Sequence, residues 1–332
     1  MKKSYCFHPL LKNISILDND QVIVQKIYEL TARFNIDNVS RTKAYENLFL
    51  LHPEMRWSYL ASMVSRNAGW NMTDLQSPMF STLLSEKTRF HMFYTYEKAN
   101  WFIFSDAFPQ LLIYSYSTYL QKNRFHLLSN FLISRFMQEE WRYYWENKNN
   151  ERLLFSLIVN EQNLLEEPLL KHPLYKRKVF HSLSYLFQNF FHLSSVIFPT
   201  RRGELYGGSV TQFTKLNKRI SFGKKLARLL FDPELFHEFL DFSFHQNHTG
   251  SRVDYEQYLA EEKLITTPWL RLSWPIVTHH IHEKRDWTTK RRPLPGWEQE
   301  ITPFKEKNIT SWFLQKRFEI QSCMKIMQSF KK

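Results

Sequence analysis

Apolar residues recur at steps of three and four along most of the chain, which is the spacing of one face of an α-helix. In the first such segment, Ile23, Ile27, Leu30 and Phe34 form one stripe. Capping residues and first-turn prolines bound further segments of this kind. The pattern predicts helices over residues 20–34, 40–51, 53–69, 124–146, 151–165, 178–198, 232–245 and 310–330.

Prolines and glycines interrupt this pattern at three places. Pro109 lies inside the apolar stretch 100–121, where its ring displaces a backbone hydrogen bond and should kink or break a helix. Residues 199–209 hold three glycines and predict a loop, and residues 287–303 predict an irregular connector.

The composition favours helices over sheets. The chain has 332 residues with 43% hydrophobic and 17% aromatic residues, enough for a large packed core. It has only 7 Gly, whereas sandwiches and doubly wound folds need many turn and phosphate-loop glycines. We therefore expect an all-α, multi-helix globular bundle or orthogonal array with little or no β structure. We expect residues 1–332 to form a single domain, and the alternative is a C-terminal subdomain beginning near residue 200.

The termini and cysteines indicate a cytoplasmic protein. Cys6 and Cys323 form no disulfide framework, and the basic N-terminus is not followed by an apolar signal segment. The apolar stretches 100–121 and 179–200 contain polar residues throughout, among them Asp106, so they predict buried helices and no transmembrane segment.

The formal net charge of +13 favours anionic partners. Residues 201–228 carry eight basic residues against one acidic residue, and residues 232–262 carry the reverse. The basic segment could bind phosphates of a nucleic acid, a nucleotide or a membrane surface, or it could pair with the acidic segment. The candidate anion-binding residues are Arg201, Arg202, Lys215, Lys218, Arg219, Lys224 and Lys225.

A second basic run, residues 284–292, has Trp287 inside it. Interleaved basic and aromatic residues suit a nucleic-acid backbone and a stacked base. A solvated connector has the same composition.

The weak metal candidates are Glu234, His237, Asp241, His245 and His248, which share one helical face. Helical di-iron sites use two E-x-x-H pairs, and only one is present here, so a polar surface stripe is the alternative. His279, His280 and His282 also cluster, but they lack the usual accompanying ligands. We predict no cofactor.

Polar residues gather around the glycine at position 69, and acidic residues follow within aromatic sequence. A charge in such a setting is costly unless it is paired, so Glu97 and Asp106 should meet arginines or amides. The group could line a ligand pocket or form a buried structural network. It comprises Arg41, Arg66, Asn67, Asn71, Asp74, Glu97, Asn100 and Asp106.

Motifs of the commonest enzyme classes are missing from the sequence, including the phosphate-binding loop, the dinucleotide fingerprint, the nucleophile elbow and paired C-x-x-C. Four stretches do resemble a known family: NVSRT at 38–42, HPEMRW at 52–57, MVSRNAGWNMTDL at 63–75 and EKANWFIFSDAFP at 97–109. They are similar to the YppC-like group of uncharacterised proteins from Bacillus-type bacteria. The resemblance implies a bacterial cytoplasmic protein and transfers no activity or site residue.

Two functional hypotheses follow. The first is a helical binding protein for a nucleic acid or another polyanion. The alternative is a helical enzyme or small-ligand-binding protein with a polar pocket around Arg66, Asp74, Glu97 and Asp106.

Overall fold

The computed structural model describes residues 19–166, 195–209, 215–259, 267–280 and 286–329. The first part of the chain is entirely helical, as the hydrophobic spacing predicts. Its elements are α2 (Asp20–Phe34), α3 (Asn38–Leu51), α4 (Arg56–Asp74), α5 (Pro78–Leu83), α6 (Glu86–Leu120), the 3-10 helix η2 (Phe125–Phe131), α7 (Arg135–Asn147) and α8 (Asn150–Leu164).

The second part adds a small β-hairpin to further helices. The hairpin is antiparallel, with Ile197 opposite Gly207. The elements are β1 (Ser195–Pro199), β2 (Leu205–Ser209), α11 (Leu216–Leu230), α12 (Phe236–His245), α13 (Val253–Glu256), α14 (Leu270–Ser273), the 3-10 helix η6 (Trp287–Thr289) and α15 (Thr310–Ser329). The prediction of a predominantly helical protein is confirmed.

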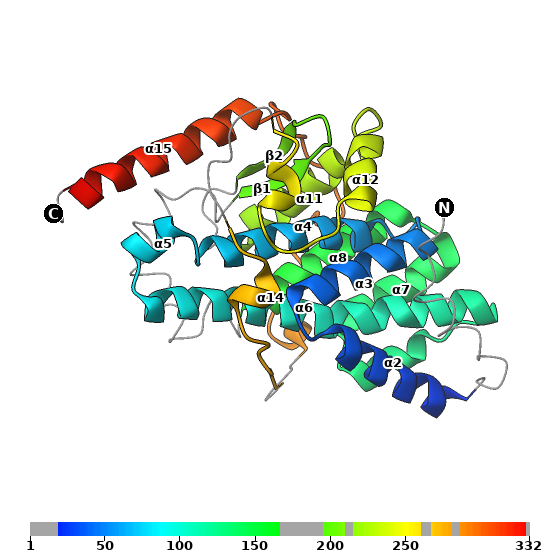
Figure 1. Ribbon diagram of the computed structural model, residues 1–332. Helices are drawn as coiled ribbons and strands as arrows, with labels where there is room; N and C mark the ends of the chain where they lie inside the picture. The colour runs from blue at the N-terminus through cyan, green and yellow to red at the C-terminus, as the bar shows by residue number, and fades with distance from the viewer. Residues whose placement is uncertain (1–18, 167–194, 210–214, 260–266, 281–285, 330–332) are drawn as a thin grey trace.

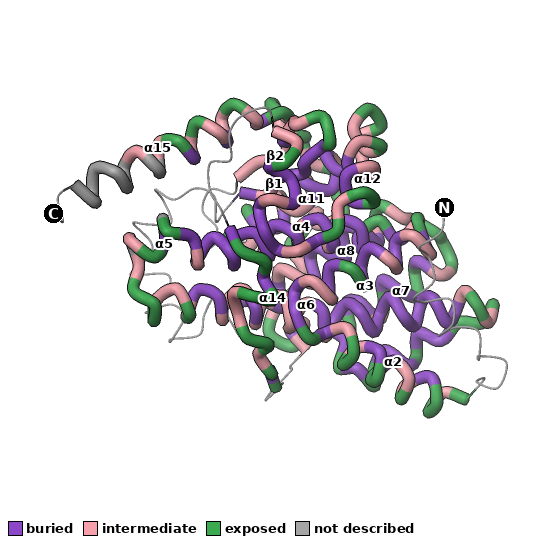
Figure 2. Tube along the Cα trace, in the orientation of Figure 1, coloured by how far each residue is buried: buried purple, intermediate pink, exposed green. Residues whose placement is uncertain are grey.

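Helix α4 runs through the middle of the molecule (Figure 1). It packs against α3, α6 and α8 on the N-terminal side of the chain and against β1, α11 and α14 on the C-terminal side. Almost all of its residues are buried, and the buried trace dominates the centre of the molecule (Figure 2). One hydrophobic cluster extends from Ile23 to Phe313 and includes residues of both halves.

Local signals explain where several helices begin. Asn19, Ser77 and Ser85 each accept a hydrogen bond from a backbone N–H in the first turn of α2, α5 and α6. Such caps satisfy donors that have no partner inside the helix. Helix α3 begins at Asn38, with Asp37 as its cap, and so starts two residues before the predicted position.

Four further predicted boundaries are wrong. The helix predicted from Pro53 begins at Arg56, because Pro53 and Glu54 lie in a turn. Helix α4 continues past Gly69 to Asp74, and the missing side chain at Gly69 leaves space for Asn38 and His248. The predicted helix 124–146 is divided into η2 and α7, with Ser134 capping the second. The helix predicted from Asp232 begins at Phe236, since a turn precedes it.

Pro109 does not break α6, which is a single helix of 35 residues. The helix is buried around this position, and packing on the core stabilises it more than one lost hydrogen bond destabilises it. The stretch 100–121 therefore belongs to a buried helix, as predicted. No helix in the described part of the chain is long and apolar enough to cross a membrane.

The β-hairpin shows that two further predictions are wrong. Residues 195–198 lie in β1 and not in a helix; residues 178–194 of that predicted helix lie outside the described residues. Within the predicted loop 199–209, residues 205–209 form β2. A Cβ atom on Gly207 would lie 2.0 Å from the carbonyl oxygen of Val196, so glycine permits this close strand pairing.

Candidate functional site

The polar side chains of α4 point to segments far away in the sequence. Arg66 donates through its two terminal nitrogens to the backbone carbonyls of Gln246 (2.9 Å) and Ser243 (3.2 Å). Glu46 lies 3.9 Å from the same guanidinium. The buried Arg66 charge is thus held at the C-terminal end of α12.

Asn67 holds the hairpin. Its Nδ2 donates to the carbonyl of Ile197 (2.8 Å), and its Oδ1 accepts from the N–H of Ile197 (2.9 Å). This is the pairing that a neighbouring strand would make. The other edge of the hairpin is covered by residues 307–309, since Gly207 donates to Lys307 and Ile309 donates to Leu205. Both hairpin edges are therefore occupied.

Asp74 forms a buried ion pair with Arg252. The Nε atom of Arg252 lies 2.6 Å from Oδ1 of Asp74, and its terminal nitrogens also bond Asn71 (3.2 Å) and Tyr255 (2.7 Å). Both charged side chains are 3% exposed, so each charge depends on the other for compensation. The polar group predicted from the sequence includes Asp74 and Asn71 but not Arg252.

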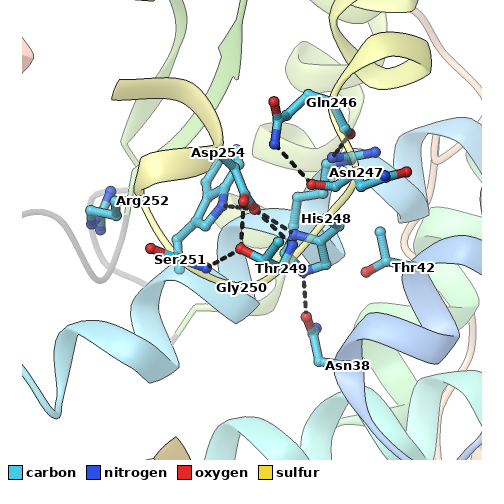
Figure 3. Close-up of polar contacts among 12 residues, drawn as sticks. Asn38, Thr42, Gln246, Asn247, His248, Thr249, Gly250, Ser251, Arg252 and Asp254 are labelled. Carbon is cyan, nitrogen blue, oxygen red and sulfur yellow. Dashed lines mark hydrogen bonds and ion pairs between the residues drawn. The ribbon is translucent and has the colours of Figure 1, made fainter. Parts of the chain in front are cut away.

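A chain of buried polar groups surrounds His248 (Figure 3). Nε2 of His248 lies 2.8 Å from Oδ1 of Asn38, and Nδ1 lies 3.3 Å from Oδ2 of Asp254. Trp70 and the backbone N–H of Thr249 also donate to Asp254, at 3.1 and 3.0 Å. These hydrogen bonds join α3, α4 and the segment that leads into α13.

Burial lowers the pKa of His248, and the hydrogen bond with Asp254 opposes this effect. Burial raises the pKa of Asp254, but hydrogen bonds from His248 and Thr249 outweigh it and lower the pKa below its usual value. A histidine beside a carboxylate is the arrangement of many general bases. Here both groups are buried, so these hydrogen bonds connect helices inside the protein.

Glu97 and Asp106 meet an arginine and amides, as predicted. Glu97 pairs with Arg41, whose second terminal nitrogen lies 3.1 Å from Oε2. Asp106 accepts from Gln110 and Asn160, both at 2.7 Å. These two carboxylates lie in separate networks, and each is almost fully buried.

The predicted pocket residues thus make bonds to the protein itself. Asn100 also bonds its own helix, donating to the carbonyl of Tyr96 at 2.8 Å. A ligand at any of these groups would have to replace a buried hydrogen bond or ion pair, which is costly. The polar-pocket hypothesis stays a prediction, and its residues are distributed over several contacts between helices.

The basic segment is divided between paired, buried and exposed side chains. Arg201 pairs with Asp241 at 3.0 Å, and Arg202 pairs with Glu238 at 2.6 Å. These pairs join residues 201–228 to residues 232–262, as expected if the basic segment pairs with the acidic segment. They compensate the hairpin arginines but involve none of the lysines of α11.

Arg219 and Lys224 point into the protein. Arg219 pairs with Glu166 and donates to Oε1 of Gln162 at 3.0 Å. Lys224 donates to the backbone carbonyls of Trp297 and, at 2.8 Å, Gln299. Burial lowers the pKa of Lys224. Both side chains are about 3% exposed, so they tie α11 to neighbouring segments.

Three lysines form the accessible part of this segment, and we call them the lysine stripe: Lys215, Lys218 and Lys225. Lys215 and Lys218 are exposed, and Lys225 is half-buried with its ammonium 5.7 Å from the Phe304 ring centre. Lys218 and Lys225 are seven residues apart and so lie on one side of α11, and Lys215 is the N-cap residue directly before the helix. Among the described residues, no carboxylate forms an ion pair with any of the three.

Trp287, in the second basic run, does not present its ring to solvent. It is 6% exposed, contacts the ring of Phe136 at 5.4 Å and donates to Asn160 at 2.8 Å. A base could stack on it only after its removal from the core. The interpretation of this run as an exposed aromatic and basic surface is therefore wrong at Trp287.

The candidate metal ligands lie apart. Glu234, His237 and His245 are exposed, Asp241 bonds Arg201 and His245, and His248 is buried in its own network. No group of three metal-ligating side chains is found in the ranges that the structure describes. His279 is buried against Tyr94 and Trp101, whereas His280 is exposed and His282 lies outside the described residues.

Comparison with known proteins identifies relatives without a known activity. The chain is 42% identical over 311 residues to the uncharacterized protein YppC of Bacillus subtilis (strain 168), a match that covers 93% of this chain and 97% of that protein. No solved structure matches the chain. The family model described as "Protein of unknown function (DUF2515)" matches residues 33–317. The chain therefore belongs to this family.

Proposed function

We propose that the protein binds a polyanion, with nucleic-acid phosphates as the model partner, and that the lysine stripe of α11 makes the central contacts. The observation that carries this proposal is the selective pairing of charges in residues 201–228. The hairpin arginines have acidic partners, whereas Lys215, Lys218 and Lys225 form no ion pair with any carboxylate among the described residues.

The rest of the molecule supports such a contact. The net charge of +13 attracts anions from a distance. Lys224 and Arg219 fix α11 to the protein through buried bonds, so the stripe lies on an ordered helix. Phosphate contacts of this kind give binding that depends strongly on salt and little on base sequence.

Charge-removing variants test the proposal. Lys215→Gln, Lys218→Gln and Lys225→Gln are combined, and binding of labelled single-stranded and double-stranded DNA is followed by fluorescence anisotropy over a range of salt. Each phosphate contact contributes about 0.9 to the slope of log affinity against log salt on duplex DNA, so the slope should become shallower by about 2 to 3.

The matched control removes the same charge elsewhere. Arg33→Gln, Lys87→Gln and Arg142→Gln change exposed residues on α2, at the start of α6 and on α7. The control variant should retain the parent slope within about half a unit. Equal slopes for the α11 variant and the parent would assign the binding to another surface.

A further inference from the structure

Two aromatic rings lie beside the lysine stripe. Lys218, Phe222 and Lys225 follow one another at steps of four and three, so they share one face of α11. The ring of Phe222 contacts the ring of Phe304, with the ring centres 6.0 Å apart. The ammonium group of Lys225 lies 5.7 Å from the centre of the Phe304 ring. The two rings and the two lysines therefore form one group of neighbouring side chains.

Both rings are held in place and remain partly accessible. Phe222 and Phe304 are half-buried, and part of each side chain packs on the hydrophobic core. Gly208 of β2 lies directly beside Phe304, since a Cβ atom on this glycine would be 2.7 Å from Cε1 of the ring. A ring that the protein already orders loses little conformational entropy when a flat partner packs on it.

The positive charge beside these rings comes from the lysine stripe. Lys305 and Glu306, which follow Phe304, are both exposed and offset each other. Arg228, one turn after Lys225 on α11, pairs with Glu300. Phosphates that approach the rings therefore meet the stripe lysines first.

Rings next to lysines favour single-stranded nucleic acid over other polyanions. Ammonium groups attract phosphates of any polyanion. Aromatic rings add a contact that requires an unpaired base, and proteins that bind single strands combine basic side chains with such rings. The aromatic and basic combination predicted for residues 284–292 is absent there, since Trp287 is buried, and is present on α11.

We propose that α11 binds single-stranded nucleic acid, with phosphates at the lysine stripe and unpaired bases against Phe222 and Phe304. This inference rests on the proposed function and specifies the partner of that surface. A helix rises about 1.5 Å per residue, so Lys218 and Lys225 are about 10 Å apart along α11. Phe222 lies between them, and its ring is thus placed between two phosphate contacts.

An abasic oligonucleotide separates the two kinds of contact. A strand of about 20 nucleotides without bases keeps its phosphates and sugars and spans the site, so it measures the lysine contacts alone. Labelled oligodeoxythymidine of the same length should bind the parent at least about fivefold more tightly in fluorescence anisotropy, because each stacked base adds about this factor or more.

A ring-removing variant locates the stacking contact. Phe222→Leu combined with Phe304→Leu keeps an apolar side chain at both positions. It should lose at least about fivefold in affinity for oligodeoxythymidine and keep the parent affinity for the abasic strand and for duplex DNA, whose bases are already stacked. The matched control, Phe90→Leu with Phe244→Leu, changes rings that are 43% and 50% exposed on α6 and α12 and should bind all three probes as the parent does.

The outcomes separate this inference from the proposed function. Equal affinity of the parent for the two strands would overturn the inference, while salt-dependent binding of the abasic strand would still support polyanion binding. Binding of neither strand at low salt would contradict both. The comparison of strands uses the parent alone, so a folding defect in the variant does not affect it. An unchanged affinity of the folded ring variant for oligodeoxythymidine would also overturn the inference.

Discussion

At the scale of single residues, Gly69 shows how closely two distant segments approach inside the protein. It lies in the middle of α4, where glycine costs about 1 kcal/mol relative to alanine. A Cβ atom at this position would lie 2.5 Å from Oδ1 of Asn38 and 2.6 Å from Nε2 of His248. Glycine is therefore required at this position because a side chain has no room there, and its conformational freedom is not the reason.

Gly69→Ala should destabilise the protein by about 1 to 3 kcal/mol, because the added methyl group displaces two buried, hydrogen-bonded side chains. Urea unfolding measures the change in free energy. The double variant Gly69→Ala with His248→Ala supplies the control, since removing the imidazole relieves part of the overlap. The two single effects should then sum to more than the double effect. An unchanged or increased stability of Gly69→Ala would contradict this contact.

Glu161 gives a prediction of pH dependence. Burial raises the pKa of Glu161 to about 7. An acid with a raised pKa in the folded state contributes stability below its unfolded pKa of about 4.3, and that contribution is lost as the pH rises to about 7.

Glu161→Gln removes the ionisable carboxyl group and therefore the loss of folding stability as the pH rises. The variant should gain about 1 to 3 kcal/mol relative to the parent at pH 8, and the gain should shrink towards pH 5. Urea unfolding of both proteins across this pH range measures the difference. A constant difference between pH 5 and pH 8 would mean that Glu161 ionises normally in the folded state.

At the scale of elements, the hairpin depends on α4. Ile197 has its N–H and carbonyl directed at Asn67, and not at another strand. A two-stranded hairpin is marginally stable alone. Its position in this protein thus follows from one amide side chain together with the segment at residues 307–309.

Asn67→Ala should destabilise the protein by about 2 to 4 kcal/mol, because it leaves a buried donor and a buried acceptor without partners. The amide of Ile197 should also exchange with solvent faster, and hydrogen exchange measures this directly. Asn163→Ala is a matched control, since Asn163 is a buried helical amide that donates to the carbonyl of Val159 in its own helix. Similar exchange at Ile197 in both variants would show that Asn67 does not hold β1.

The sequence predicts helices well where local signals decide, as in α2, where the predicted range 20–34 matches the observed helix Asp20–Phe34. It fails where distant contacts decide. Gly69 lies inside α4 at a point where His248, far away in the sequence, leaves no room for a side chain, and the hairpin depends on Asn67. The spacing of hydrophobic residues within a short stretch of sequence does not reveal such distant contacts.

Contacts between residues far apart in the sequence also limit what could be predicted of the candidate site. Polar residues near Gly69 could be recognised as a group, and the need of Glu97 and Asp106 for partners followed from their apolar surroundings. Arg252, the partner of Asp74, lies 178 residues away in sequence. The signal available in the sequence was that Arg252 is the only Lys or Arg among the eight acidic residues of segment 232–262.

At the scale of the whole molecule, the two halves of the chain share buried charges as well as apolar contacts. The ion pair of Asp74 with Arg252 and the hydrogen bonds of Arg66 to carbonyls at the C-terminal end of α12 cross between them. The hydrophobic cluster also includes residues of both. Separating the halves would expose buried charges that have no other partner of similar geometry.

We therefore predict one cooperative unfolding transition. Far-ultraviolet circular dichroism and tryptophan fluorescence should give the same midpoint in urea, as for a two-state protein. Two resolved transitions would instead indicate a C-terminal subdomain that unfolds independently.

The proposed function depends on accessible lysines at the start of α11 and along it, which form no ion pair among the described residues. Hairpin arginines and acidic residues of α12 already form pairs, so they should contribute little to the contact with phosphates. The contribution of the lysine stripe should appear as a loss of affinity when salt rises.

The most direct test is the affinity of the unmodified protein for labelled duplex DNA, measured by fluorescence anisotropy at about 50 and 200 mM salt. Three phosphate contacts predict a loss of affinity of at least about 40-fold between these conditions. No binding at the lower salt, or binding that changes less than about fourfold, would contradict polyanion binding by the lysine stripe.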